Sequence, residues 1–262
     1  MTLTIHHLGV RYPKPQGGDT PVLADIDLAI PAGEFVVLLG ASGCGKSTLL
    51  NAIAGFSLPT EGEIRVDQRR ITGPGADRGV VLQTDALYPW LNARENVAFG
   101  LRLRSIPLKE RQKRAEDTLA LVGLAGKGEH ATWQLSGGQR QRVSLARALI
   151  ADPDILLMDE PLGALDALTR EQMQDLVLEV WQRTGKTIVF VTHSLDEALY
   201  LGTRLLILAG PPGRIILDEG IPFARQALEI GSKVKALPDF VAARERLRQV
   251  IFNGAAAAGD LG

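Results

Sequence analysis

The sequence predicts an α/β protein built on a mostly parallel β-sheet. Short, nearly continuous apolar runs recur along the chain, which is typical of strands that are buried on both faces. Helical patterns lie between these runs, as the crossover connections of a parallel sheet require. The apolar runs are residues 35–40, 79–83, 155–160, 187–192 and 204–208.

Two further strands are predicted near the N-terminus, over residues 3–12 and 22–30. In the second strand, Ile26, Leu28 and Ile30 alternate with Asp25 and Asp27. This period of two indicates a strand with one buried face. The segment between the two strands, "PKPQGGDT", is rich in proline and glycine and is expected to be a loop.

Helices are predicted over residues 47–55, 108–124 and 140–150. The first follows a glycine-rich turn, and Gly55 is its expected C-cap. In the second, Ala115, Leu119 and Val122 fall on one face at spacings of four and three. The third places Val143, Ala146 and Ile150 on one face in the same way.

Length, charge and cysteine content narrow the class of protein. The 262 residues suffice for one large domain or for a domain with an inserted subdomain, and the net charge of −1 gives no support to a nucleic-acid partner. The single cysteine excludes an intrachain disulfide. A secretory signal and an apolar run of roughly 18 residues, enough to span a membrane, are both missing. We therefore expect any role at a membrane to be exerted from its cytoplasmic side, through a partner.

The stretch "GASGCGKST" matches the phosphate-loop pattern G-x-x-x-x-G-K-[ST] and lies between a predicted strand and a predicted helix. Its glycines allow successive backbone amides to face phosphate oxygens. We expect Lys46 to reach the β- and γ-phosphates of ATP and Ser47 to bind Mg²⁺. Cys44 occupies a variable position and is interpreted as a small residue that fits. The predicted cofactor-binding residues of the loop are Gly40, Ala41, Ser42, Gly43, Cys44, Gly45, Lys46, Ser47 and Thr48.

Polar residues also follow three other apolar runs. Asp159 and Glu160 end "ILLMDE", and we expect Asp159 to hold Mg²⁺ and Glu160 to position the attacking water. His193 ends "VFVTH", where the carboxyl ends of parallel strands meet a ligand, and we expect it to contact the γ-phosphate. Gln83 ends "GVVLQ", and its amide is a candidate for the metal or the water. Glu160, His193, Gln83 and Lys46 are thus the predicted catalytic residues.

A second glycine-rich turn, "LSGGQ", opens the helix near residue 140. Ser136 is a good N-cap, while Gly137 and Gly138 allow a ligand to approach the backbone next to Gln139. The chain has no second phosphate-loop lysine for this turn to serve. We therefore expect it to contact the nucleotide of a second copy, in a two-fold dimer with two equivalent sites.

Taken in order, these motifs resemble those of the nucleotide-binding subunit of an ATP-binding-cassette (ABC) transporter. The resemblance covers residues 3 to about 208. It implies a P-loop NTPase fold with a RecA-like parallel sheet core, an antiparallel β-subdomain and an inserted helical signature subdomain. It also implies that Tyr12 stacks on adenine, that Asp166 contacts the second copy, and that Ser47, Gln83 and Asp159 hold Mg²⁺.

The resemblance also implies a division of the chain and a set of partners. The catalytic core comprises residues 3–84 and 151–225, the helical subdomain residues 85–150, a C-terminal helical extension residues 226–252 and a flexible tail residues 253–262. The expected partners are a second copy, membrane permease subunits and, indirectly, an external solute-binding protein. The protein would then be a peripheral ATPase on the cytoplasmic face of the cell membrane.

Within the family, the chain is most similar to the ATPases of importers for taurine, aliphatic sulfonates and nitrate. The segments "GPGADRGVVLQ", "LYPWLNARENVAFGL" and "PLGALDALTREQMQ" carry this likeness, and the C-terminal segment "PPGRIILDEGIPFARQ" favours the taurine member. The apolar cluster Tyr88, Pro89, Trp90 and Leu91 either packs under the helical subdomain or forms a groove for a permease helix. A cassette ATPase without a transport role and a small-molecule kinase are the remaining alternatives.

Overall fold

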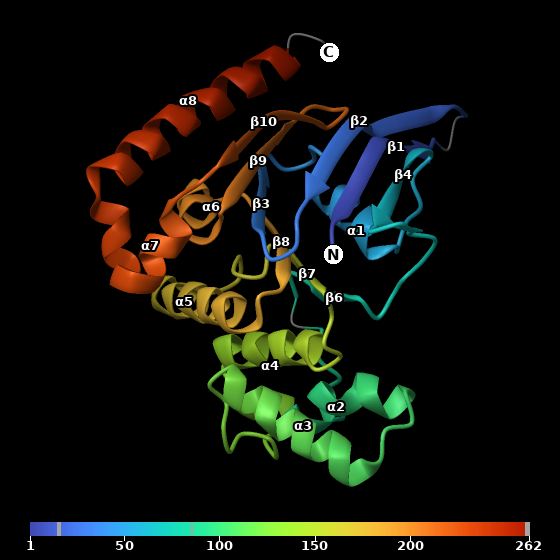
Figure 1. Cartoon of the computed structure of the whole chain (residues 1–262), viewed down its shortest axis with the longest axis vertical. Coiled ribbons are helices and arrows are strands. Elements are labelled where there is room, and N and C mark those ends of the chain that lie inside the picture. The colour runs from blue at the N-terminus through green and yellow to red at the C-terminus, as the bar shows by residue number, and fades with distance from the viewer. Residues whose placement is uncertain (15–16, 85, 260–262) are drawn as a thin grey trace. The chain divides into compact units, whose positions relative to one another are not determined.

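The computed structural model describes residues 1–14, 17–84 and 86–259, with side chains up to residue 253. The chain divides into two compact units, each described by itself (Figure 1). The first unit comprises residues 1–75 and 187–262, and the second comprises residues 76–186. The predicted division at residues 84 and 150 is therefore not the division by compactness.

The first unit contains two sets of strands. An antiparallel sheet has the order β2-β1-β4-β5, formed by β1 (Leu3–Pro13), β2 (Asp19–Ile30), β4 (Glu61–Val66) and β5 (Arg69–Arg70). The other set has the order β10-β9-β3-β8, formed by β3 (Phe35–Gly40), β8 (Thr187–Thr192), β9 (Arg204–Ala209) and β10 (Arg214–Gly220). Strand β3 pairs in parallel with both β8 and β9 and lies between them.

The helices of the first unit follow its strands. Helix α6 packs against β3 and β8, and α7 and α8 pack against α6. Their bounds are α1 (Lys46–Ala54), α6 (Leu195–Leu201), α7 (Phe223–Ile230) and α8 (Pro238–Gly259). Helix α8 includes residues 253–259, which were predicted to be part of a flexible tail. Four consecutive alanines, the strongest helix formers, account for this extension. Residues 260–262 of the predicted tail lie outside the described residues.

The second unit joins a pair of parallel strands to four helices. The strands are β6 (Arg78–Val81) and β7 (Ile155–Asp159). The helices are α2 (Ala93–Leu103), α3 (Leu108–Leu121), α4 (Gly137–Leu149) and α5 (Ala167–Thr184). Helices α2, α3 and α4 pack on one another, and α4 also packs on β6 and α5 (Figure 1). Strands β6 and β7 therefore belong to the same compact unit as the helical segment.

The core contains the residues that the sequence patterns predict. Strands β3 and β8 are buried at every position, as their continuous apolar runs require. Ala115, Leu119 and Val122 are all buried, as are the three predicted core positions of α4. In β2, Ile26, Leu28 and Ile30 are buried while Asp25 and Asp27 are exposed. The predicted helix faces and the half-buried strand are thus confirmed.

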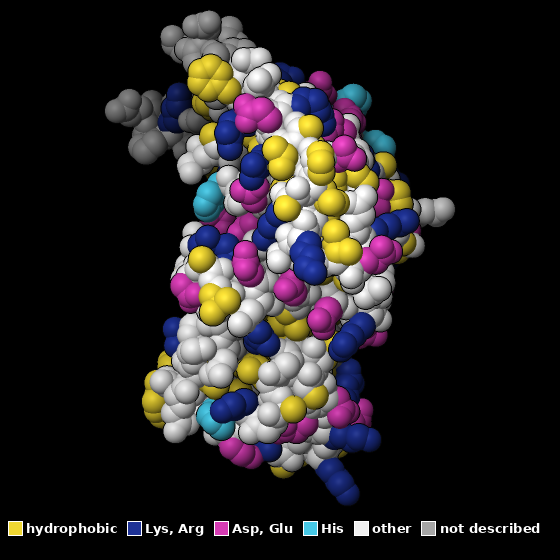
Figure 2. All heavy atoms as spheres, turned by 90° about the vertical axis from the view of Figure 1, so that its left-hand side faces the viewer, with side chains coloured by type: hydrophobic (Ala, Val, Ile, Leu, Met, Phe, Trp, Pro, Cys, Tyr) yellow, Lys and Arg dark blue, Asp and Glu magenta, His cyan; other side chains and the backbone are white. Residues whose placement is uncertain are grey.

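The surface carries no dominant sign of charge on the face that Figure 2 shows, where acidic and basic side chains are interspersed. This agrees with the net charge of −1. Among the described residues, no helix is both long enough and apolar enough to cross a membrane.

Candidate nucleotide site

The phosphate loop connects β3 to α1 in the first unit. Gly43 and Gly45 have φ values of +82° and +100°, in the left-handed region that favours glycine. Gly45 also has no room for a side chain, because a Cβ atom there would lie 2.6 Å from Leu23 Cδ2. These glycines allow the loop to curl tightly ahead of the helix, which is the geometry that directs backbone amides toward a bound phosphate.

The side chain of Lys46 lies inside the curled phosphate loop. It is buried, and its Nζ atom donates hydrogen bonds of 2.9 Å to the carbonyl oxygens of Gly40 and Ala41. The ammonium group is therefore held inside the loop, at the centre of the backbone segment that would surround phosphates. Ser47 follows in the first turn of α1, and its side chain is exposed together with those of Ala41 and Ser42.

Cys44 packs beneath the loop. It is 1% exposed, and burial raises the pKa of its thiol. A buried neutral thiol is a poor nucleophile, so the interpretation of Cys44 as a packing residue fits the structure. The neighbouring β9–β10 turn approaches the same backbone, since a Cβ atom on Gly213 would lie 2.1 Å from the Cys44 carbonyl oxygen.

His193 lies at the same sheet edge as the phosphate loop. Leu39 of β3 is in register with Thr192 of β8, so Gly40 and His193 are the next residues along two adjacent parallel strands. His193 is exposed. Its backbone is fixed by its neighbours: Thr192 donates a 2.6 Å hydrogen bond to buried Glu197, and the N–H of Ser194 donates to Thr192.

Ser194 caps helix α6 by accepting a hydrogen bond from the N–H of Glu197. Serine is one of the residue types that serve best as an N-cap. Glu197 was not predicted as part of the site. No sequence pattern indicated this role, because one glutamate within a helix does not reveal that its carboxylate is buried and accepts a hydrogen bond from a threonine at the end of a strand.

The second unit brings together the other strand-end residues. Val81 of β6 is in register with Met158 of β7. Gln83 therefore follows β6 at the edge where Asp159 and Glu160 end β7. Asp159 and Glu160 are both half-buried, and Gln83 is exposed. Glu160 has a φ of +42°, a conformation that residues other than glycine rarely adopt.

The "LSGGQ" turn opens α4 as predicted. Ser136 is the N-cap and accepts a hydrogen bond from the N–H of Gln139, whose side chain accepts one from the N–H of Ser136. Gly138 is buried against the first turn of α5, where a Cβ atom would lie 2.4 Å from Thr169 Cγ2. Gly137 remains exposed.

Asp166 is the N-cap of α5 and accepts a hydrogen bond from the N–H of Thr169, which lowers the pKa of its carboxyl group. The N-termini of α4 and α5 therefore lie together in this unit. Both present their positive dipole ends.

Tyr12 lies near the end of β1, where it pairs with Thr20 of β2, and its side chain is 44% exposed. This exposure leaves a ring face accessible, as stacking on a base requires. Pro15 and Gln16, in the loop that follows, lie outside the described residues.

The Tyr88–Leu91 turn is held by a residue that the sequence did not suggest. Asn96 is fully buried in α2. It accepts a hydrogen bond from the N–H of Tyr88 and donates to the carbonyl oxygens of Tyr88, Leu91 and Asn92. Arg147 of α4 adds a hydrogen bond to the carbonyl of Ala86 and lies over the Tyr88 ring. No helix was predicted over residues 93–103, so no sequence pattern indicated that Asn96 is buried.

The turn displays an exposed aromatic residue. Trp90 is 73% exposed and packs on Tyr88, which in turn packs on Phe99. Next to it, α2 and α3 line a pocket that contains the apolar side chains of Leu91, Phe99 and Leu108 together with three arginines. Packing under the helices thus accounts for the half-buried Tyr88 and Leu91 but not for Trp90.

Comparison with known proteins gives consistent matches. A model of the ABC transporter family matches residues 23–163. The taurine import ATP-binding protein TauB of Pseudomonas putida is 51% identical over 255 residues, which cover 96% of this chain and 95% of that protein. The protein of the same name from Burkholderia thailandensis is 54% identical over 240 residues, covering 91% and 92% of the two chains.

Solved structures agree with these sequence matches. The dimeric ATP-binding cassette MJ0796, in a post-hydrolysis state bound to ADP and Pi, is 35% identical with a TM-score of 0.74. The match covers 84% of this chain and 99% of that chain. A second dimeric structure of MJ0796, described as a bacterial ABC transporter cassette, gives the same values. The predicted fold class, a P-loop NTPase with an inserted helical subdomain, is confirmed.

Proposed function

Because the chain belongs to the ABC transporter family, we propose that it is the ATP-hydrolysing subunit of an importer and that the imported solute is taurine. One observation carries the choice of solute. Relatives about half identical to the chain over nearly its whole length bear the name of taurine import ATP-binding protein. The cytoplasmic face of the cell membrane is the proposed location.

Binding of ATP is assigned to the phosphate loop and to Tyr12. The loop amides and the N-terminus of α1 bind phosphate oxygens, and Lys46 exchanges its two carbonyl partners for the β- and γ-phosphates. Tyr12 offers an exposed ring to adenine. The buried ammonium group fits this role, since a fixed cation inside a curled loop is electrostatically suited to a polyphosphate.

Hydrolysis is assigned to Glu160 and His193, with Gln83 as a further contact to the water. Glu160 orients the attacking water by accepting its hydrogen bond, and His193 donates to the γ-phosphate as negative charge shifts in the transition state. Ser47, Gln83 and Asp159 would hold Mg²⁺, because hydroxyl, amide and carboxylate oxygens are the ligands this ion takes. When bound, Mg²⁺ supplies charge neutralisation at the β- and γ-phosphates.

The second copy completes the nucleotide site. Ser136, Gly137, Gly138 and Gln139 would face the phosphates bound by the partner, with Asp166 at the same contact. The adjacent N-termini of α4 and α5 support this proposal, because together they form one surface of partial positive charge. The chain's own phosphate loop already has the N-terminus of α1, so this second surface is available to the nucleotide of the partner. The dimeric state of the MJ0796 cassette supports it as well.

The proposed permease contact is the pocket between α2 and α3 together with Trp90. The apolar lining suits the apolar face of a helix, and the lining residues Arg102 and Arg111 favour carboxylates in that helix. Replacing Trp90 with alanine is expected to reduce transport while leaving basal ATPase activity and melting temperature unchanged. Loss of ATPase activity and stability together would assign Trp90 to folding instead.

The solute is tested by uptake in cells that lack the gene. Loss of labelled taurine uptake, restored by the wild-type chain but not by Lys46→Ala, is the expected result. Growth on ethanesulfonate as sole sulfur source separates the nearest alternative. If taurine uptake survives while sulfonate growth fails, the ATPase assignment stands and the solute becomes an aliphatic sulfonate; nitrate is the next candidate.

An external solute-binding protein would deliver the solute to the permease. If no transport phenotype appears, a non-transport cassette ATPase is favoured.

A further inference from the structure

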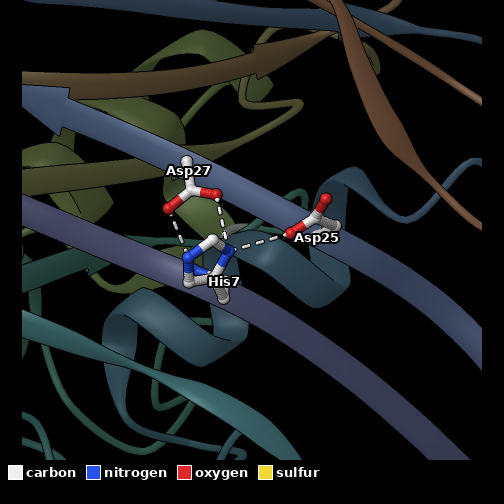
Figure 3. Close-up of side chains that lie close together, drawn as sticks. All are labelled: His7, Asp25 and Asp27. Carbon is white, nitrogen blue, oxygen red and sulfur yellow. Dashed lines mark hydrogen bonds and ion pairs between the residues drawn. The ribbon is translucent and has the colours of Figure 1, made fainter.

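His7, Asp25 and Asp27 lie together on the exposed side of the β1–β2 pair, outside the residues assigned to the nucleotide. His7 Nδ1 is 3.0 Å from Asp25 Oδ1 and 3.2 Å from Asp27 Oδ2. Figure 3 shows the ring pointing toward both carboxylates. Within the described part of the chain, this is the one group of three potential metal ligands whose donor atoms all lie within 4.8 Å of one another.

Two irregularities of strand pairing create this arrangement. Ile5 pairs with Leu28 and Leu8 with Ile26, so His6 and His7 together face Asp27 alone. Leu8 pairs with Ile26 and Val10 with Leu23, so Ala24 and Asp25 together face Gly9 alone. Each strand thus has a β-bulge, and the two bulges are consecutive along the pair. Bulges redirect side chains, and these place His7 and Asp25 beside Asp27.

The backbone at both bulges is left-handed, a conformation that aspartate and histidine adopt more often than most other residues apart from glycine. His7 has a φ of +44° and Asp25 a φ of +52°. Left-handed conformations of residues other than glycine cost on the order of 1 kcal/mol each. The N–H of His7 donates a 3.0 Å hydrogen bond to Asp27 Oδ1, which orients that carboxylate and leaves Oδ2 facing the ring.

The two separations from His7 Nδ1, 3.0 Å to Asp25 Oδ1 and 3.2 Å to Asp27 Oδ2, fall in the range found between ligands of one metal ion. Ligands about 2.1 Å from an ion lie about 3.0 Å apart along the edge of an octahedron and about 3.4 Å apart in a tetrahedron. One imidazole and two carboxylates suit first-row divalent transition metals, whereas Mg²⁺ and Ca²⁺ prefer oxygen alone. We propose that His7, Asp25 and Asp27 form a surface site for a divalent transition-metal ion such as Zn²⁺.

Such a site would link the two strands of the antiparallel sheet at their bulges. A bound ion would neutralise the two carboxylates and replace the contacts between the His7 ring and the two aspartates with three coordinate bonds. Binding only to the folded state raises stability in proportion to the logarithm of the metal concentration. The proposal does not depend on the nucleotide site or on the transported solute.

The test uses the full chain without nucleotide, treated with a chelator and then desalted. Isothermal titration with ZnCl₂ should give one ion per chain, and MgCl₂ should give no binding heat at the same concentration. His7→Asn and Asp25→Asn remove a ligand but retain residue types that tolerate a left-handed backbone. Each should weaken Zn²⁺ binding at least about tenfold. His6→Ala, at the exposed neighbouring position, should bind as the wild type does.

Thermal unfolding provides the second measurement. Zn²⁺ should raise the melting temperature of the wild type and of His6→Ala, but not that of His7→Asn. Undiminished Zn²⁺ binding by His7→Asn would overturn the proposal, because the ion would then bind elsewhere. Absence of binding by the folded wild type would also overturn it, and would leave the cluster as an ion pair between protonated histidine and two carboxylates.

Discussion

At the level of single residues, Glu160 shows how the candidate site departs from regular geometry. Asp159 ends β7 in the strand, while the next residue has a φ of +42°. Strained backbone of this kind gathers at active sites, where surrounding contacts hold it. The identity of the two acids at a strand end was predictable from sequence. The left-handed backbone was not, because it depends on the turn that follows the strand.

Asp152 gives a residue-level test of the second unit. It accepts a 2.6 Å hydrogen bond from Lys186 Nζ, and this contact holds the pKa of Asp152 below its ordinary value of 3.8. The folded-state pKa is the lower one, so the pair stabilises the protein above the unfolded pKa and loses its effect as pH falls through the folded pKa. Since Asp152 is largely exposed, we expect about 0.3–1 kcal/mol.

Urea unfolding of the wild type and Asp152→Asn measures this contribution. Asparagine tolerates the left-handed backbone of this position, where φ is +53°. The difference in unfolding free energy should be the same at pH 7 and pH 5 and should shrink only below the ordinary pKa of 3.8. Equal stability of wild type and Asp152→Asn at pH 7 would contradict the prediction.

At the level of elements, the β9–β10 turn packs against the backbone of the phosphate loop. Gly213 donates a hydrogen bond from its N–H to Val22 and accepts one at its carbonyl from Ala24. Its Cα lies so close to the loop that a Cβ atom would meet the Cys44 carbonyl at 2.1 Å. We predict that Gly213→Ala displaces the loop and raises the KM for ATP about tenfold or more.

Gly220→Ala is the matched control for Gly213→Ala. It lies at the far end of β10, and its nearest neighbour would be the Thr203 carbonyl at 4.0 Å. Its KM for ATP should equal that of the wild type. The ATPase assay should be accompanied by melting temperatures, since a folded Gly213→Ala protein with wild-type KM would show that the close approach does not position the loop.

The turn before α2 depends on Asn96. Asn96→Ala would leave the N–H of Tyr88 without its acceptor and would remove the amide group that the carbonyl oxygens of Tyr88, Leu91 and Asn92 share. We expect a loss of about 2–3 kcal/mol in unfolding free energy, measured by chemical denaturation. Trp90 fluorescence in the folded state should change as well. Lys109→Ala, exposed on α3, should change neither quantity; a loss below about 0.5 kcal/mol for Asn96→Ala would refute this role.

Some elements were predictable from sequence because one local pattern determines them. The continuous apolar runs predicted β3 and β8, Gly55 predicted the end of α1, and Ser136 predicted the start of α4. Strand β10 was not predicted, because its residues alternate between exposed and half-buried positions without a clear apolar face. The bulges at His7 and Asp25 arise from pairing between distant segments, which no single-segment pattern contains.

At the level of the whole molecule, the motifs fall into two groups. The phosphate loop and His193 belong to one compact unit, and Gln83, Asp159, Glu160 and the "LSGGQ" turn belong to the other. The motif order placed the division at the ends of the helical segment. Division by compactness groups β6 and β7 with the helices, and the division by motif order stays a prediction.

The proposed mechanism requires that two copies of the chain enclose the nucleotides that they hydrolyse. Light scattering of Glu160→Gln with MgATP tests it most directly, because this variant should bind ATP without hydrolysing it. We predict a mass about twice the 28.2 kDa of one chain with MgATP and the single mass without it. Adding Lys46→Ala to Glu160→Gln should abolish the dimer. A Glu160→Gln protein that binds ATP and still has the mass of one chain would contradict the claim.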